Sequence, residues 1–526
     1  MRILQHVKED SYMVKKYLIS IIIIWTITFC IHASQGQMVK EDDSGNASEE
    51  IVKKKSDIKE EIKETIHEVT VEGKKIKYRA TAGTMLLKED IDDPKATIFF
   101  IAYTKIGAED VGRRPITFSF NGGPGSSSVW LHLGLLGPKR VLMDDDGHAL
   151  PPPYRLIENE YSLLDKTDLV FIDPVSTGFS RALPEEDPKQ FHGIEEDVQS
   201  VGEFIRLYTT RFKRWASPKF MIGESYGTTR AAGLSGHLQE RHGLYLNGIM
   251  LVSSILNFQT ARFDRGNDLP HILFLPTFTA TAWYHKKLQG DLQDDLQKAL
   301  AESKAYALGE YASVLMKGDN LTSAEYETTV QKLSRLTGLS SEYIEQTNLR
   351  INIYRFVKEL LREQRQTIGR LDSRFTGIDY DAAGELYEFD PSYAAIQGPY
   401  TATLNDYIRR DLEFESDLPY EILTGNVGPW NYGQYRNRYV NVAETLREAM
   451  TKNPNLKVFV ANGFYDLATP FLATEYTFSH MGLDESLRNN VIMGFYEAGH
   501  MMYIEKNSLI QLKADLSTFI EQAISP

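Results

Sequence analysis

Short apolar runs that end in polar or glycine-containing loops recur in two stretches of the chain, and each has the length of a buried strand. They cover residues 96–103, 116–120, 169–172, 220–222, 248–252, 456–461 and 490–496. Between two of these runs, Val198, Val201 and Ile205 recur at roughly helical spacing within residues 194–212. Strands that alternate with helices predict an α/β fold with a mostly parallel central sheet flanked by helices.

The first part of this sheet domain is expected to span residues 67–258. It begins with two β-rich runs, 67–70 and 75–80, separated by Glu72 and Gly73. A tight polar turn between such runs predicts a hairpin, and we expect it at an edge of the sheet.

Residues 259–441 have a different pattern, with no recurring strand-like runs. Helical periodicity predicts helices over residues 291–307, 323–337, 341–346 and 353–368. Strand-like runs resume afterwards, so residues 442–526 form the second part of the sheet domain, with a last helix over 508–524. The segment between the two parts is therefore interpreted as a largely helical cap insertion, and caps of this kind shape a pocket.

The N-terminus carries Lys15 and Lys16, then the apolar residues 17–31, then small residues. This pattern predicts a signal peptide over residues 1–36 and export to the periplasm or the exterior; an uncleaved membrane anchor is the alternative. Residues 37–66 are rich in Lys, Glu, Asp and Ser, which predicts a charged, disordered linker.

Composition limits the possible partners. The 526 residues are 42% hydrophobic, enough for a sizeable core, and carry a formal net charge of −14. That charge argues against a nucleic-acid partner and against a stable membrane partner. The single cysteine, Cys30, lies in the apolar N-terminal segment, so the processed chain is expected to lack disulfides. The sequence leaves open whether the protein forms a homodimer.

The apolar run that ends at Ile222 leads into Gly223-Glu224-Ser225-Tyr226-Gly227 and then into a helix-forming segment. Small residues on both sides of a serine allow a sharp strand-to-helix turn that exposes its hydroxyl. The pattern predicts acyl transfer through a Ser225 ester. The alternative for the pentapeptide alone is an ordinary turn.

A serine nucleophile needs a general base that a carboxylate orients. Asp466 follows the run 456–461, and His500 follows the run 490–496. Carboxyl ends of parallel strands meet at one edge of a sheet, and the chain order Ser, Asp, His fits a nucleophile-elbow enzyme. Ser225, Asp466 and His500 are therefore the candidate catalytic residues. By itself, an Asp in such a loop is also compatible with a turn former.

A glycine-rich loop, residues 121–128, directly follows the run 116–120. Such a loop exposes backbone N–H groups, and the residue after a nucleophile supplies another, so Gly123 and Tyr226 are the candidate oxyanion hole. A phosphate-binding role is the rival interpretation. It is disfavoured because the Lys and Ser/Thr of a P-loop are missing.

Four motifs in this order resemble the serine carboxypeptidase family: residues 121–128, residues 223–227, Asp466 after Gly463, and residues 498–501. Residues 168–175 add a similar segment between the two glycine motifs. The resemblance implies the α/β-hydrolase fold and an exopeptidase that removes C-terminal residues from peptides with a free C-terminus. It implies Ser225, His500 and Asp466 as a triad that needs neither a metal nor an organic cofactor.

In the family, an Asn and the Glu before the serine bind the terminal carboxylate of the substrate, and these correspond to Asn121 and Glu224. The carboxyl group of Glu224 and the terminal carboxylate of a bound peptide would lie too close for both to be ionised. We therefore expect peptide affinity to fall as the pH rises through the pKa of that pair. A helix N-terminal acid is the alternative role for Glu224.

Three positions depart from the family pattern: Ser119, Ser126 and Leu135 stand where many members have Trp, Cys and Glu. The change to Ser126 removes a disulfide that eukaryotic members use, and the chain is interpreted as a bacterial-type member. Leu135 removes the second carboxylate partner of the substrate. Two alternatives therefore stay open, an esterase or acyltransferase on the same triad and a non-catalytic protective or binding protein.

Overall fold

A mixed sheet of ten strands runs through the described residues, 58–90 and 93–525, of a computed structural model. The expected signal peptide, residues 1–36, and most of the expected linker lie outside the described residues. Nine strands follow one another across the sheet in this order: β1 (Ile62–Val71), β2 (Lys74–Asp90), β3 (Asp93–Lys105), β7 (Asp168–Ile172), β4 (Ile116–Phe120), β9 (Lys219–Glu224), β10 (Gly248–Val252), β13 (Lys457–Gly463) and β14 (Val491–Tyr496). The short β8 (Arg181–Ala182) pairs with β3.

The six strands from β7 to β14 are mutually parallel, as the alternation of strands and helices predicts. The strands β1, β2 and β3 are antiparallel and form the other edge. The hairpin expected there forms, but β1 begins at Ile62, inside the stretch 37–66 expected as a linker. The strand starts there because the backbone of Ile62 pairs with Gly83 of β2. Its side chain is exposed, so the pattern of buried apolar residues does not mark the start of the strand.

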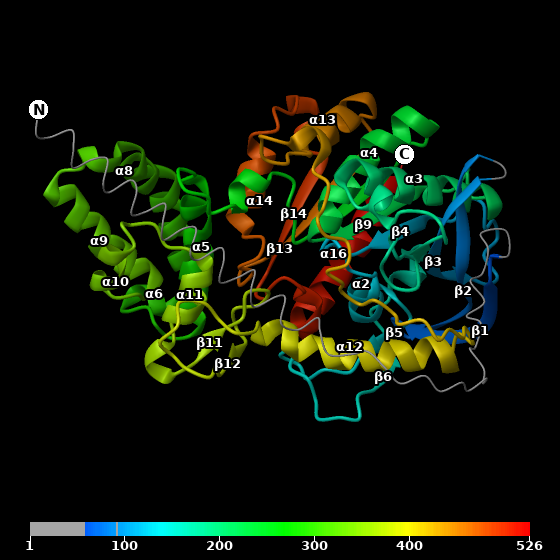
Figure 1. Ribbon diagram of the computed structural model, residues 1–526, viewed down its shortest axis with the longest axis horizontal. Coiled ribbons are helices and arrows are strands. Elements are labelled where there is room, and N and C mark those ends of the chain that lie inside the picture. The colour runs from blue at the N-terminus through cyan, green and yellow to red at the C-terminus, as the bar shows by residue number, and fades with distance from the viewer. Residues whose placement is uncertain (1–57, 91–92, 526) are drawn as a thin grey trace, which may run out of the picture. The chain divides into compact units, whose positions relative to one another are not determined.

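Both faces of the sheet are buried because successive side chains of a strand point to opposite faces. Phe100 packs with α3 (Ile194–Arg211), α4 (Tyr226–His242) and α13 (Ala443–Lys452). The preceding residue, Phe99, belongs to the opposite cluster, which includes α2 (Val129–Leu131) and the last helix, α16 (Lys506–Ile524). Figure 1 shows α3 and α4 on one side of the strands and α16 crossing them. The sheet is therefore the middle layer of three.

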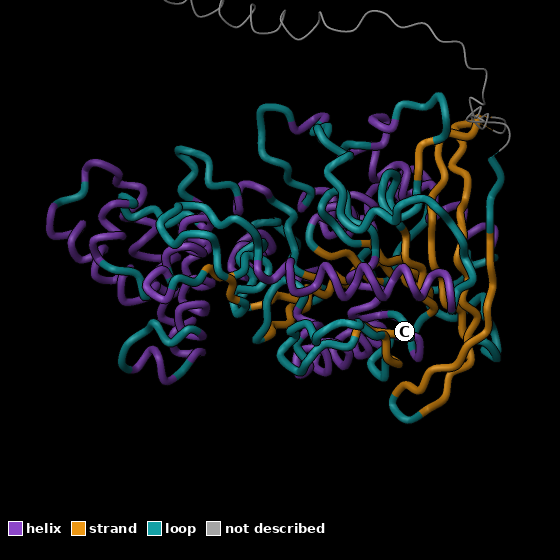
Figure 2. The backbone as a smooth tube through the Cα atoms, turned by 60° about the horizontal axis from the view of Figure 1, so that its bottom comes forward, coloured by secondary structure: helices purple, strands orange, loops and turns teal. Residues whose placement is uncertain are grey.

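The cap is largely helical, and Figure 1 shows most of its helices gathered beside the end of the sheet formed by β13 and β14. Its members are α5 (Leu269–Tyr284), α6 (Asp291–Asp294), α7 (Leu296–Tyr306), α8 (Ala312–Lys317), α9 (Ser323–Thr337), α10 (Ser341–Gln346), α11 (Ile353–Glu359) and α12 (Pro391–Arg410). Figure 2 shows these helices apart from most of the strands, with α12 as the long helix that returns along the sheet domain. The helices α14 (Phe471–Ser479) and α15 (Glu485–Arg488) lie between β13 and β14 in the chain.

Two expected cap helices are wrong in extent. The helix expected over residues 291–307 is interrupted at Asp295, whose backbone is extended, so it forms α6 and α7 instead. Residues 353–368 were expected to form a single helix, but α11 ends at Glu359. Arg365 then has a positive φ of 56°, which a helix cannot accommodate. The residues that follow form β11 (Thr367–Ile368), which pairs with β12 (Thr376–Gly377).

The end of the insertion crosses back over the sheet domain without regular structure. Single bridges join its residues to the loops after several strands: Gly178 to Glu421, Ser126 to Leu423, Gly193 to Asn431 and Asn257 to Asn441. A second small pair of strands, β5 (Lys139–Val141) and β6 (Leu156–Glu158), lies against α12. Within residues 58–90 and 93–525, no helix is both long and apolar enough to span a bilayer.

Candidate active site

Ser225 occupies the turn between β9 and α4. Its φ of 60° and ψ of −128° lie outside the regions that side-chain-bearing residues usually adopt. The turn is held by the backbone N–H of Ser225, which donates to the carbonyl of Val252 on β10 at 3.0 Å. A strained serine between a strand and a helix is the geometry of a nucleophile elbow.

The glycine-rich loop after β4 lies directly against this elbow. A Cβ added to Gly122 would lie 2.4 Å from the backbone N of Tyr226, and one added to Gly227 would lie 2.8 Å from the carbonyl O of Phe120. Only glycines allow two loops to approach so closely. As a result, Gly123, Ser225 and Tyr226 line one cavity of about 180 Å³. The two candidate oxyanion donors are thus brought beside the candidate nucleophile.

The structure also brings Asp466 and His500 together. Nδ1 of His500 lies 2.7 Å from Oδ2 of Asp466, and both side chains are buried. Asp466 is fixed in turn because it accepts from the backbone N–H groups of Ala468 at 2.7 Å and Thr469 at 3.0 Å. With Nδ1 used by the carboxylate, Nε2 is the nitrogen left for general-base work.

Ser225 and His500 line the same cavity of about 380 Å³. In the part of the chain that the structure describes, the Ser225 hydroxyl makes no hydrogen bond to the His500 ring. Such contacts are often long in a free enzyme and shorten when substrate binds. Burial lowers the pKa of His500, but the charge and hydrogen bond of Asp466 and the charge of Glu224 outweigh it, so the pKa is raised. This favours proton uptake by the ring.

A short strip of the cap holds the loops that carry Asp466 and His500. The backbone N–H of His500 donates to the carbonyl of Leu371 at 2.7 Å, and that of Leu467 donates to the carbonyl of Arg370 at 3.1 Å. The N–H of Gly499 donates to Oδ2 of Asp372 at 3.1 Å. Asp372 is buried and ion-paired with Arg374 at 2.7 Å. The strip Arg370–Arg374 is therefore bonded to both loops, the one that carries Asp466 and the one that carries His500.

Glu224 and Asn121 meet as the resemblance implies. Nδ2 of Asn121 donates to Oε1 of Glu224 at 3.0 Å, and both residues line the 380 Å³ cavity with Ser225. The other oxygen, Oε2, accepts from the hydroxyl of Tyr503. Burial raises the pKa of the Glu224 carboxyl to about 7; the nearby His500 and the hydrogen bonds from Tyr503 and Asn121 offset only part of that rise. Glu224 therefore exchanges a proton near neutral pH.

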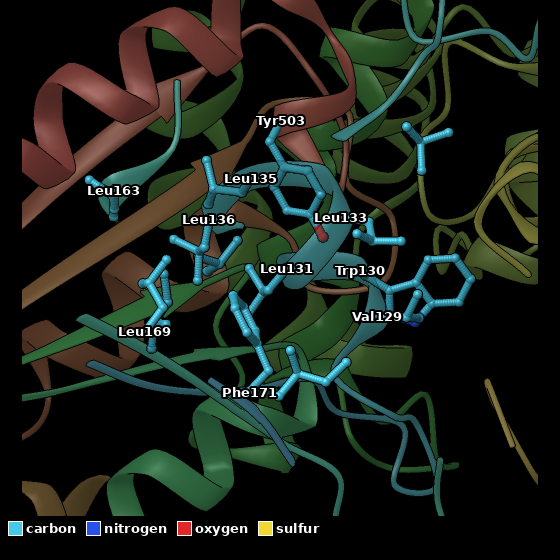
Figure 3. Close-up of a cluster of buried hydrophobic side chains, with 14 of the residues drawn as sticks. Val129, Trp130, Leu131, Leu133, Leu135, Leu136, Leu163, Leu169, Phe171 and Tyr503 are labelled. Carbon is cyan, nitrogen blue, oxygen red and sulfur yellow. The ribbon is translucent and has the colours of Figure 1, made fainter. Parts of the chain in front are cut away.

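The three departures from the family pattern are all buried. Leu135 belongs to the apolar cluster of Figure 3, in which the ring of Tyr503 also lies. Ser126 accepts from the indole N–H of Trp130 at 2.9 Å, whereas the hydroxyl of Ser119 has no partner within the described residues. At the position where the resemblance implies a second carboxylate, this chain thus has an apolar core, and the phenol of Tyr503 donates to the second oxygen of Glu224.

Sequence reasoning missed Tyr503 and Arg370. Tyr503 lies three residues after His500, and that nearness is the one sequence signal that could have pointed to it. Arg370 lies in the cap, far along the chain from each motif, yet it lines both cavities at Ser225. No local pattern marks it.

Residues 58–90 and 93–525 contain no group of three His, Cys, Asp or Glu side chains placed to bind a metal ion.

The parallel sheet, the elbow at the end of β9 and the two loops after β13 and β14 define the class of α/β-hydrolases. Within that class the family can also be identified, because the model of the serine carboxypeptidase family matches residues 74–508 of this chain. The chain belongs to the serine carboxypeptidase family.

Individual relatives match over shorter stretches. The pheromone-processing carboxypeptidase KEX1 of Saccharomyces cerevisiae is 33% identical over 151 residues, which are 27% of this chain and 20% of that protein. Serine carboxypeptidase-like 33 of Arabidopsis thaliana is 28% identical over 151 residues, 28% of this chain and 29% of that protein. The chain thus matches only about a fifth to a third of the length of these curated relatives.

The crystal structure of KEX1(Δ)p, a prohormone-processing carboxypeptidase from Saccharomyces cerevisiae, is similar with a TM-score of 0.54 and 17% identity. The match covers 84% of this chain and 91% of that chain. At this identity the likeness concerns the fold. It agrees with the α/β-hydrolase architecture described above.

Proposed function

We propose that this protein is an exported serine-type carboxypeptidase that removes C-terminal residues from peptides through a Ser225 acyl-enzyme. One observation carries the proposal. A buried Glu224, paired with Asn121 and with a pKa raised to about 7, lies in the same cavity as Ser225 and His500. A carboxyl group that can hold a proton beside a serine nucleophile suits a substrate that ends in a carboxylate.

In the proposed reaction, Nε2 of His500 takes the hydroxyl proton of Ser225 while the oxygen attacks the carbonyl carbon of the last peptide bond. The N–H groups of Gly123 and Tyr226 stabilise the negative oxygen of the tetrahedral intermediate. His500 then gives its proton to the departing amine, which leaves with the C-terminal residue. Water, deprotonated by His500, hydrolyses the ester and restores Ser225. Asp466 keeps the ring oriented throughout.

In the bound state, a proton shared between Glu224 and the substrate carboxylate removes the repulsion between two negative charges. Asn121 donates to Glu224 and, in the proposed complex, contacts the same carboxylate. The surrounding wall is rich in apolar side chains, among them Trp130, Ile396 and Met501. We propose that it accepts an apolar C-terminal residue.

The experiment compares an N-blocked dipeptide, its C-terminal amide and a simple ester, each with wild type and Ser225→Ala. Release of the C-terminal residue from the free acid, dependent on Ser225, supports the proposal. Turnover of the ester alone would favour an esterase or acyltransferase. No Ser225-dependent turnover of any substrate would favour a protective or binding protein.

Two further parts of the proposal rest on the sequence. Export rests on residues 1–36, and it is tested by the N-terminal sequence and the cell fraction of the mature protein. A mature chain that retains residue 1 in the cytoplasm would contradict it.

A bacterial-type member is proposed from Ser126 and the single Cys30. The relatives named above are fungal and plant proteins, so the cysteine pattern alone supports this part of the proposal.

A further inference from the structure

A second cavity adjoins Ser225 on the side away from Glu224. The cavity of about 180 Å³ shares Gly123, Ser225 and Arg370 with the larger one, but Asn121 and Glu224 do not line it. If the terminal carboxylate binds at Asn121 and Glu224, as the proposed function holds, the residue before the scissile bond must enter this second cavity. We refer to it as the acyl-side cavity.

The acyl-side cavity carries positive charge and no opposing acid. Arg370 and Arg262 line it, and no Asp or Glu is among its lining residues. Within the described residues neither guanidinium takes part in an ion pair, and the buried Nε of Arg370 has no hydrogen-bond partner. A buried donor without a partner is costly, so a ligand with acceptor oxygens would bind there with an advantage over an apolar one.

The positive charge continues outward. Phe258, Arg262 and Tyr432 also line a neighbouring cavity of about 780 Å³, so the two spaces are contiguous. There, Arg436 and Arg438 add two further guanidinium groups.

A single acid lines this outer cavity. Asp264 accepts from the hydroxyl of Tyr439 at 3.2 Å. Arg438 lies over the ring of Tyr435 at 5.2 Å, an arrangement that holds a guanidinium in place without neutralising it. Four arginines and one carboxylate thus line these two cavities, along the path that the proposed function assigns to the peptide.

This path is opposite in sign to the chain as a whole, whose formal net charge is −14. The positive charge of this path therefore contrasts with the net charge of the chain, and an anionic ligand would be attracted to it. We propose that the acyl-side cavity is a subsite for an acidic side chain, so that the enzyme acts on peptides with Asp or Glu before the scissile bond. Arg370 is the specificity-determining residue, and Arg262 supports it.

The test uses four N-blocked dipeptides that end in Phe and carry Glu, Gln, Leu or Lys before it. For wild type, we expect kcat/KM for the Glu peptide to exceed that for the isosteric Gln peptide by about tenfold or more, as charge-assisted hydrogen bonds to a guanidinium allow. The ratio should shrink as salt is added, because part of the cleft is exposed.

Arg370→Gln should bring the Glu-to-Gln ratio close to one, and Arg370→Lys should keep part of it because the charge is retained. Arg262→Gln, at an exposed residue, should lower the ratio without risk to the fold. The matched control is Arg113→Gln, an arginine with 83% of its side chain exposed in the loop before β4, which should leave the ratio unchanged.

The outcomes separate the two proposals. Equal cleavage of the Glu and Gln peptides, or a preference for Lys, overturns the acidic subsite and leaves the carboxypeptidase proposal intact. An unchanged ratio in both Arg370→Gln and Arg262→Gln also overturns it. No release of Phe from any of the four peptides contradicts the carboxypeptidase activity itself.

Discussion

Tyr503 donates its hydroxyl to the carboxylate of Glu224, the residue immediately before Ser225. The two residues come from chain segments far apart in sequence, and both are buried. Because Asn121 holds the other oxygen, Glu224 is fixed on both sides while its pKa lies near 7. A titratable group so placed can govern how the proposed activity responds to pH.

The first prediction concerns that response. The pKa of Glu224 is raised to about 7, so the side chain is neutral at acidic pH and becomes charged as the pH rises through that value. Affinity for a peptide carboxylate should therefore be highest at acidic pH and fall above about 7. Measured kcat/KM should decline for the free peptide and not for its C-terminal amide. Parallel declines for both substrates would contradict this.

The second prediction concerns Tyr503→Phe. The hydrogen bond from Tyr503 favours the ionised form of Glu224, so its loss should raise the pKa of Glu224 further. The alkaline decline for peptides should then move to higher pH by about one unit, the scale of a hydrogen bond to a charged group. Tyr326→Phe, at a tyrosine in the cap that donates to the carbonyl of Glu345, is the control. An unmoved profile in Tyr503→Phe would count against the role.

The third prediction concerns the contact between the glycine-rich loop and the elbow. In Gly122→Ala the new Cβ would lie 2.4 Å from the backbone N of Tyr226, so the loop and its N–H groups must shift. Loss of one oxyanion donor costs about 10²–10³-fold in kcat, and we expect a loss in that range with a smaller change in KM. Gly309→Ala, where the added Cβ meets nothing within 4 Å, should keep wild-type activity.

The fourth prediction concerns the orientation of His500. Asp466→Asn should lower kcat by about 10⁴-fold, because an amide fails to hold the ring in the tautomer with a free Nε2. The fold should persist, since the side chain keeps its size. Asp319→Asn, on an exposed turn of the cap, is the matched control. Wild-type kcat in Asp466→Asn would remove Asp466 from the proposed triad.

The fifth prediction concerns the strip of the cap that holds both catalytic loops. Asp372→Ala leaves the buried Arg374 without its ion pair and the Gly499 N–H without an acceptor. Removing one partner of a buried pair typically costs about 3 kcal/mol or more. Urea denaturation should show a loss of that size, with reduced kcat in the folded fraction. A loss no larger than that of the exposed Asp319→Ala would contradict the account.

The parts of the site that follow strands could be predicted because their signals are local. The run before Ser225 and the runs before Asp466 and His500 each mark a strand end, and a parallel sheet brings such ends together. The roles given to these residues stay predictions until the variants are measured. Tyr503 and Arg370 carry no such signal, since their positions depend on packing between distant segments.

The same contrast holds for the cap. Its amphipathic helices α9 and α10 could be predicted to the residue from periodicity. Residues 269–284 form the long helix α5 but are apolar on nearly every face, so no period of 3.6 stands out. Pro276 and Pro399, within α5 and α12, further conceal the helices, because proline is a breaker signal in sequence.

The backbone contacts of Arg370 and Leu371 with Leu467 and His500 bear on how such enzymes can diverge. The insertion is hydrogen-bonded to the loops that carry Asp466 and His500, so it cannot be exchanged independently of them. A chimaera that borrows this segment from a relative must import the matching loops after β13 and β14 as well. Otherwise the transplanted segment changes both the choice of substrate and the geometry needed for catalysis.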